Sequence, residues 1–272
     1  MIKIATWNVN SIRKRINQIA QFIVDNNIDI LLLQEIRCTE QQFPYSVIEQ
    51  LGYEYAINGQ ITRNGVCIIS KYQILQTYKV DMIKNVQEAR YIECIIKIDI
   101  HKIRVISVYV PNGGQGGNFY IRKLEFLDNL YHRIQSVIKN EEVIILAGDY
   151  NIALDMLDIF DINSFNEQGC FHIQARQKLR AILNLGFKDI FRLLNPHLQE
   201  FTWWSYQGKA LYNNQGLRID YILLSAKIID RLKVCYIDPQ WRKIAPHSSD
   251  HAPVICGIEL TSSLMNGRNR LF

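Results

Sequence analysis

The fold class predicted by the sequence is α/β with a mixed β-sheet, and three observations support it. Short apolar runs typical of strands alternate with amphipathic helical segments along the 272 residues. Polar residues follow some of these runs and precede others, so strands of both directions must meet if these polar residues share one edge. No internal repeat and no Pro-, Gly- or Ser-rich linker divides the chain. We therefore expect one domain over residues 1–260, followed by a loose polar tail at 261–272.

Eight runs rich in β-branched residues or leucine have the composition of strands. They are Ile2–Trp7, Ile28–Leu33, Gly65–Ser70, Tyr91–Ile100, Arg104–Val110, Val143–Ala147, Tyr221–Leu224 and Val254–Leu260. Apolar residues at steps of three and four predict helices between them. The clearest helical patterns begin at Ile12 and Tyr120, and a third lies near Ala175–Leu185 and ends at Gly186.

The composition excludes several classes of protein. Apolar residues make up 48% of the chain, too many for an intrinsically disordered protein. No stretch approaches the roughly 18 apolar residues that a membrane helix needs, and the first residues lack the layout of a signal peptide. We therefore expect a soluble, cytoplasmic protein. The net charge of +5 is a mild bias that is compatible with a polyanionic partner.

Polar residues border the predicted strands at both ends. They follow strands at Asn8, Glu35, Tyr109–Asn112 and Asp149–Asn151, and they precede strands at Asp220 and Asp250–His251. These groups can meet at one edge only if the last two strands run antiparallel to the others. A purely parallel sheet would not collect strand starts and strand ends together. The sequence therefore predicts mixed sheets, two of them packed face to face with helices outside.

Convergence of these residues would bring together four carboxylates, those of Glu35, Asp149, Asp220 and Asp250. Clustered carboxylates repel one another and take up protons unless a cation joins them. Oxygen ligands favour Mg²⁺, with Mn²⁺ as a substitute, and such an ion neutralises the charge that develops when a phosphodiester is attacked. A histidine beside a carboxylate, here His251, can steer a proton. The pattern predicts metal-assisted phosphodiester hydrolysis.

Each of these residues also has an ordinary structural explanation. An aspartate after a strand often caps a turn or a helix, and Asp250–His251 can be a surface pair. Their joint occurrence at strand edges is what favours a site. Other catalytic patterns are missing, because the sequence holds no phosphate-binding P-loop, no nucleophile elbow, no HExxH pair and no zinc-spaced cysteines.

Seven motifs in order along the chain resemble those of one family. They are Thr6–Arg13, Leu33–Glu35, Asn58–Gln60 with Asn64–Val66, Tyr109–Gly113, Gly148–Ile152, Gly216–Tyr221 and Ser249–Pro253. Together they resemble the exonuclease III family, the bacterial abasic-site endonuclease branch of the endonuclease/exonuclease/phosphatase superfamily. The resemblance covers residues 1 to about 260. It implies a four-layer α/β sandwich, in which two packed mixed β-sheets are flanked by helices.

The resemblance implies a role for each matched residue. Glu35 would be the main Mg²⁺ ligand, with Asn8 and Asp250 close to the ion. Asp149 would orient and deprotonate the attacking water or protonate the leaving oxygen, and the family pattern leaves both roles open. The number of metal ions, one or two, is open as well. The phosphate or its water would be contacted by Asn151, Tyr109, Asn112, and His251 oriented by Asp220.

The resemblance also implies the substrate. Trp203, Leu217 and Ile219 match the apolar lining of a pocket that admits a flipped sugar without its base. Arg13 and Arg90 match positions that contact DNA phosphates. The implied partner is double-stranded DNA with abasic sites or 3′ ends. The implied enzyme is a monomer that incises DNA 5′ to abasic sites and removes 3′ blocking groups or 3′ nucleotides.

Two segments depart from the family pattern. Ile36–Arg37 stands where the family has Thr-Lys after Gln-Glu, and Asn213–Gln215 replaces a more charged loop. The balance between abasic incision, 3′–5′ exonuclease and 3′-phosphatase activity therefore stays open. Two alternative functions also stay open. The first is a phosphoesterase of the same superfamily with a non-DNA substrate, such as an inositol phosphate, and the second is a non-catalytic nucleic-acid-binding paralogue.

Overall fold

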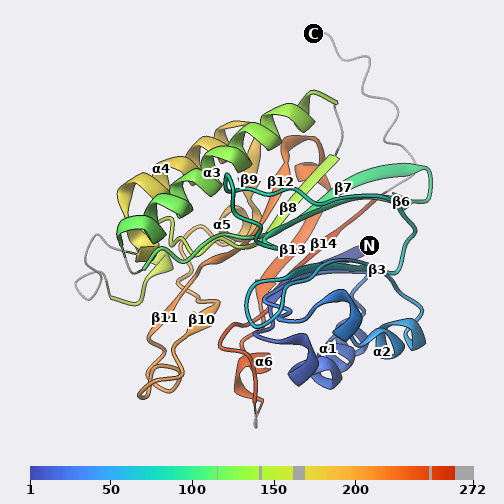
Figure 1. The fold of residues 1–272 in the computed structure, drawn as a ribbon, viewed down its shortest axis with the longest axis horizontal. Coiled ribbons are helices and arrows are strands. Elements are labelled where there is room, and N and C mark those ends of the chain that lie inside the picture. The colour runs from blue at the N-terminus through green and yellow to red at the C-terminus, as the bar shows by residue number, and fades with distance from the viewer. Residues whose placement is uncertain (115, 141–142, 162–168, 245–246, 261–272) are drawn as a thin grey trace.

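Two six-stranded mixed sheets pack face to face, and helices cover their outer faces (Figure 1). This computed structural model describes residues 1–114, 116–140, 143–161, 169–244 and 247–260. The four-layer α/β sandwich predicted from the sequence is thereby confirmed. The tail predicted at 261–272 lies outside the described residues, and the single domain over 1–260 stays a prediction.

The first sheet has the strand order β13-β14-β1-β2-β4-β3. Its strands are β1 (Ile2–Asn8), β2 (Ile30–Gln34), β3 (Glu54–Asn58), β4 (Val66–Ser70), β13 (Leu232–Ile237) and β14 (Val254–Ile258). Strand β1 is parallel to β2 and antiparallel to β14. The carboxyl ends of β1 and β2 therefore meet the start of β14 at one edge.

The second sheet has the order β5-β6-β7-β8-β12-β9. Its strands are β5 (Ile74–Tyr78), β6 (Tyr91–Ile98), β7 (His101–Tyr109), β8 (Val143–Asp149), β9 (Phe187–Asp189) and β12 (Asp220–Ser225). Strands β7 and β8 are parallel, and β12 runs antiparallel to β8 with Asp220 opposite Asp149. The predicted reversal of the last two polar-bordered strands is thus confirmed in both sheets.

Helices α1 (Ile12–Asn26) and α2 (Tyr45–Gln50) cover the first sheet, and α3 (Gly117–Val137) and α4 (Ile173–Asn184) cover the second (Figure 1). Helix α1 buries Ile12, Ile19 and Phe22 on one face and ends at Asn27, whose φ of 52° is left-handed. Two shorter helices, α5 (Ile190–Leu194) and α6 (Gln240–Lys243), and a small pair of strands, β10 (Trp203–Trp204) and β11 (Gly216–Leu217), complete the described α-helices and strands, and short 3-10 helices lie in the connections. No helix among them has the length and apolar character needed to cross a lipid bilayer.

The eight predicted strands are all present, and no end is displaced by more than three residues. The sequence patterns missed β3, β5, β9 and β13, together with the two-residue strands β10 and β11. Strand β5 is exposed at four of its five residues, and β13 is exposed at three of six, so neither is buried as the central strands are. Edge strands of this kind are defined by pairing to a neighbour, not by their own hydrophobicity.

Gly148 allows the two central strands of the second sheet to approach each other beside the site. Its φ is 150°, and a Cβ built there would lie 2.0 Å from the carbonyl oxygen of Val108 on β7. No side chain fits at that distance. The glycine therefore fixes where the last residue of β8, Asp149, stands relative to β7.

Gly148→Ala is expected to destabilise the protein by at least about 3 kcal/mol, because the methyl group would collide with the β7 backbone. Gly52→Ala is the matched control, since Gly52 also has a left-handed φ of 78° but nothing lies within 4 Å of its Cβ position. The control should cost only about 1–2 kcal/mol of backbone strain. Urea unfolding of both variants measures the difference, and equal destabilisation would contradict the collision.

Candidate active site

Asn8, the last residue of β1, links two carboxylates that lie far apart in the sequence. Its Nδ2 donates to Oε1 of Glu35 at 3.0 Å and to Oδ2 of Asp149 at 2.9 Å. Its own Oδ1 accepts the backbone N–H of Asn10 at 3.1 Å, which fixes the orientation of the amide. The side chain is fully buried. The structure therefore brings Glu35 and Asp149, predicted from separate strand ends, to a single amide group.

Glu35 stands on a tight turn after β2 and has a left-handed φ of 51°. The turn is held by backbone hydrogen bonds, from Ile36 N to Gly65 O at 3.1 Å and from Ser11 N to Glu35 O at 2.7 Å. Besides Asn8, Oε1 accepts the hydroxyl of Tyr109 at 2.8 Å, while Oε2 is bonded by the guanidinium of Arg37, with Nε at 2.8 Å. Because a non-glycine residue adopts this φ only under constraint, the position of the carboxylate is closely specified.

Asp250 offers a second carboxylate. Its Oδ1 accepts Nδ2 of Asn10 and its Oδ2 accepts Nε1 of Trp203, both at 3.0 Å. Burial alone would raise the pKa of Asp250, but the nearby His251 and these two hydrogen bonds lower it below its ordinary value. Asp250 therefore stays charged at neutral pH although most of its surface is covered.

His251 lies between two buried aspartates. Its Nδ1 is 2.9 Å from Oδ2 of Asp220, and its Nε2 is 3.8 Å from Oδ2 of Asp149. Burial would lower the pKa of His251, but the carboxylates of Asp220 and Asp149 raise it to about 10. Burial, followed by repulsion from Asp220, raises the pKa of Asp149 above its ordinary value. The ring is therefore positively charged at neutral pH, and Asp149 is poised to take up a proton.

A cavity of about 370 Å³ lies in front of these groups. One wall is polar, and the other is formed by Trp203, Leu217 and Ile219, which pack against Ala153 and Ile159 in one apolar cluster. Strand pairing of Trp203 with Leu217 builds this second wall. The cavity is lined by Glu35, Tyr109, Asn112, Asp149, Asn151, Gly169, Cys170, Trp203, Leu217, Ile219, Asp250 and His251.

Four predicted site residues do not line this cavity. Asn8 and Asp220 lie behind its wall and bond its lining residues. Arg90 lines an adjoining cavity of about 400 Å³ that shares Tyr109 and Asn112, and its guanidinium carbon is 4.7 Å from the centre of the Tyr109 ring. Arg13 does not line either cavity, and it donates from the surface to the backbone oxygen of Arg37 at 3.3 Å.

Lys123 is a site residue that the sequence reasoning missed. Its fully buried Nζ donates to the backbone oxygens of Asn112 at 3.0 Å and Asn151 at 2.6 Å, the two residues that follow β7 and β8. Burial lowers the pKa of Lys123 to about 8. A signal was present, because Lys123 lies three residues after Tyr120 and four before Leu127, on the apolar face of the predicted helix.

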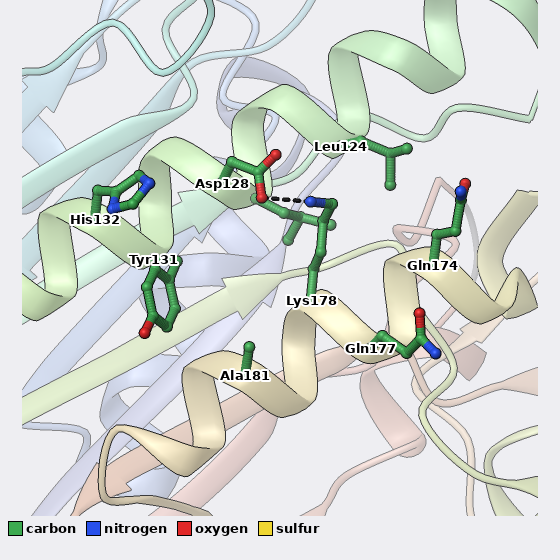
Figure 2. A pocket seen from close by; sticks show the side chains of 9 residues that line it. Leu124, Asp128, Tyr131, His132, Gln174, Gln177, Lys178 and Ala181 are labelled. Carbon is green, nitrogen blue, oxygen red and sulfur yellow. Dashed lines mark hydrogen bonds and ion pairs between the residues drawn. The ribbon is translucent and has the colours of Figure 1, made fainter.

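A hollow of about 630 Å³ lies elsewhere, between α3 and α4 (Figure 2). Figure 2 shows Lys178 of α4 reaching across to Asp128 of α3, with which it forms an ion pair. The lining is otherwise leucine, alanine, glutamine, Tyr131 and His132. Because its two opposite charges satisfy each other, this hollow lacks the convergent reactive groups of the cavity described above.

Two groups of residues near the cavity carry side chains of the kind that bind metal ions. Oxygen and nitrogen atoms of Asp149, Asp220 and His251 lie within 4.8 Å of one another. His251 is protonated there and bonded to Asp220, so it has no lone pair to offer. Glu35 and Asp250 instead present carboxylate oxygens to the cavity, and Asp250 is ionised. This donor set fits a hard divalent cation such as Mg²⁺ or Mn²⁺.

The fold and this acidic site define a class of hydrolytic enzymes, and comparison with known proteins specifies the class. The model of the Endonuclease/Exonuclease/phosphatase family matches residues 5–251. The chain belongs to this family, as its motifs predicted.

Individual relatives match almost the whole chain. Exodeoxyribonuclease III of Haemophilus influenzae is 29% identical over 93% of this chain and 98% of its own length. Among solved structures, an AP endonuclease from Archaeoglobus fulgidus has a TM-score of 0.90 and 32% identity, covering 96% of this chain and all of the other. The 3′-5′ exonuclease NExo from Neisseria meningitidis has a TM-score of 0.90 and 30% identity, covering 95% and 100%.

Asp220→Asn is expected to lower the pKa of His251 by about 1–3 units, because the carboxylate that bonds Nδ1 is lost while burial remains. Because the pKa of His251 is higher in the folded protein than its ordinary value of about 6.5, the ion pair stabilises the fold fully below about pH 6.5. This stabilisation is lost as the pH rises through the pKa that His251 has in the folded protein. The variant should lose it at lower pH. NMR titration of the His251 ring in EDTA buffer measures the shift, with His251→Asn to assign the signal. An unchanged titration would show that Asp220 does not hold the charge.

Proposed function

We propose that this protein is a Mg²⁺-dependent DNA-repair phosphodiesterase. It incises DNA 5′ to abasic sites and removes 3′ blocking groups or 3′ nucleotides. One observation carries this conclusion, namely that a single cavity joins Asp149, Asn151 and His251 on one wall to the apolar side chains of Trp203 and Leu217 on the other. The relatives support the same reading, since their names include exodeoxyribonuclease III, AP endonuclease and a Neisseria 3′ phosphatase bound to product DNA hairpin.

Glu35 and Asp250 would hold the metal ion, with Asn8 orienting Glu35 from behind. When bound, Mg²⁺ would offset negative charge on the phosphate as the phosphodiester is attacked. Tyr109 lines the same wall, and its hydroxyl, which donates to Glu35 here, would donate to a phosphate oxygen instead when substrate is bound.

The other polar residues would perform the proton transfer and stabilise the phosphate. Asp149, with its raised pKa and one oxygen fixed by Asn8, would take a proton from the attacking water near neutral pH. The backbone N–H of Asn151 bonds Oδ1 of Asp149 at 2.9 Å, which leaves the orientation of this carboxylate settled before substrate arrives. The positive ring of His251 would then face the charge that develops on the phosphoryl oxygens.

The apolar wall would select the substrate. A deoxyribose without its base can fill the space beside Trp203, Leu217 and Ile219, whereas a full nucleotide carries polar edges that would lose their hydrogen bonds there. Arg90 and Arg13 would contact DNA phosphates on the flanks, and Asn112 would contact the phosphate at the boundary of the two cavities.

The oligomeric state and the cellular compartment of the enzyme can also be proposed from this chain. All the site residues come from one polypeptide, so we propose that a monomer is active, with residues 1–260 as its catalytic domain. The six cysteines are free, five of them buried, as expected for a reducing compartment. We therefore propose that the enzyme acts in the cytoplasm.

The function is tested by incubation with a duplex that carries one abasic site, a duplex with a 3′-phosphate and an inositol phosphate, each with Mg²⁺ or with EDTA. We expect incision 5′ to the abasic site or release of the 3′ group, and no reaction in EDTA. Hydrolysis of the inositol phosphate alone would establish the non-DNA alternative. Binding of the duplex without any cleavage would establish the non-catalytic alternative.

Asp149→Asn is expected to lower the single-turnover rate by about 10²–10⁴, because the amide cannot accept the proton of the attacking water. Duplex binding should be kept, since phosphate contacts carry most of it. Asp128→Asn is the control, because this aspartate pairs with Lys178 in the hollow between α3 and α4. Near-normal cleavage by Asp149→Asn would exclude its role.

A further inference from the structure

The carboxylate of Glu35 is fully engaged by side chains of this protein. Oε1 accepts two hydrogen bonds, from Nδ2 of Asn8 at 3.0 Å and from the hydroxyl of Tyr109 at 2.8 Å. Oε2 accepts two from Arg37, with Nε at 2.8 Å and Nη2 in closer contact. A carboxylate has about four lone-pair sites. Any cation that binds Glu35 must therefore displace one of these donors.

Arg37 is the donor most easily displaced. Asn8 is buried and is held at both ends of its amide. Tyr109 is tied to the end of β7 and lies under the guanidinium of Arg90. The side chain of Arg37 is 38% exposed, and Glu35 is the only side chain that it is seen to bond among the described residues. It can rotate into solvent without moving the rest of the site.

The backbone of Arg37 stays fixed when its side chain rotates. Its N–H donates to the carbonyl oxygen of Asn64 at 3.0 Å, and its φ of 50° is left-handed, like that of Glu35 two residues earlier. Ile36 between them is fully buried. This rigid turn presents the planar guanidinium to Oε2 through two N–H groups, a geometry that a lysine ammonium does not reproduce.

We propose that Arg37 is a positioning residue that competes with the divalent cation for Oε2 of Glu35 and thereby sets the metal affinity of the site. The proposal rests on the proposed function, since it concerns the same metal site. Arg37 keeps the Glu35 carboxylate oriented and neutralised until a cation takes its place. Its release then leaves a free guanidinium at the rim of the site. The affinity for metal is lower by the amount that this ion pair contributes.

The test measures metal binding directly, without DNA. Mn²⁺ is titrated into the full chain and the free ion is followed by EPR, with Mg²⁺ as competitor. Arg37→Gln is expected to bind Mn²⁺ about 5- to 30-fold more tightly than the unsubstituted protein, because the competing cation is gone. Arg37→Lys, which keeps the charge but not the paired donors, should lie between the two.

Arg13→Gln is the matched control for loss of charge alone. Arg13 is an exposed arginine that touches the backbone of Arg37 but has no hydrogen bond to Glu35. Its removal should change Mn²⁺ affinity less than twofold. If Arg13→Gln tightens binding as much as Arg37→Gln does, the effect is one of general electrostatics and the competition is overturned.

Thermal unfolding gives a second readout that does not involve activity. A ligand that binds only the folded state raises its stability in proportion to the logarithm of its concentration over Kd. At the same Mg²⁺ concentration, Arg37→Gln should therefore gain more in Tm than the unsubstituted protein. A gain equal to that of the unsubstituted protein, together with equal Mn²⁺ affinity, would overturn the proposal.

Glu35→Ala separates this proposal from the proposed function. If Mn²⁺ binding survives Glu35→Ala unchanged, the metal is not held at Glu35 and both proposals fail. If Glu35→Ala abolishes binding while Arg37→Gln leaves it unchanged, the metal site stands and the competition alone fails. Loss of binding in Glu35→Ala with tighter binding in Arg37→Gln supports both.

Discussion

The site depends on hydrogen bonds that cross from one sheet to the other. Asn8 of the first sheet bonds Asp149 of the second, Tyr109 of the second bonds Glu35 of the first, and His251 beside the first bonds Asp220 of the second. All three contacts are largely removed from water, so each is costly to leave unmade. The apolar core between the sheets fixes their separation and thereby the geometry of these contacts.

Charge balance is the second constraint. Four carboxylates lie close together at one edge. Among the described residues, their negative charge is offset by the ring of His251, the guanidinium of Arg37 and the buried ammonium of Lys123. Each of these cations has a different set of partners. His251 lies between two carboxylates, Arg37 faces only Glu35, and Lys123 bonds backbone oxygens instead of a carboxylate. The positive charge at the site therefore comes from segments next to strands of the first sheet, through His251 and Arg37, and from α3, through Lys123.

The sequence predicted the parts of this arrangement that follow from pattern. Buried central strands such as β2 and β8 are recognisable as apolar runs in the sequence, and the polar residues at their ends are then identified as lying at the edge of a sheet. The antiparallel direction of β12 could be deduced because Asp220 precedes its strand. Edge strands such as β5 could not be predicted from the sequence, since their residues face solvent and only pairing with a neighbouring strand defines them. The bond of Arg37 to Glu35 depends on two left-handed residues in one turn, which no periodicity shows.

The polar and apolar walls of the cavity come from different parts of the fold. Asp149 and Tyr109 lie at the ends of parallel central strands, where a shift of one would require a shift of all. Trp203 and Leu217 belong to the small β10–β11 pair outside both sheets. Trp203 is nevertheless connected to the polar wall, because its Nε1 donates to Asp250 and its backbone pairs with that of His251 in an isolated β-bridge. A substitution at Leu217 would therefore change the apolar wall alone, whereas a substitution at Trp203 would also remove a hydrogen bond to Asp250.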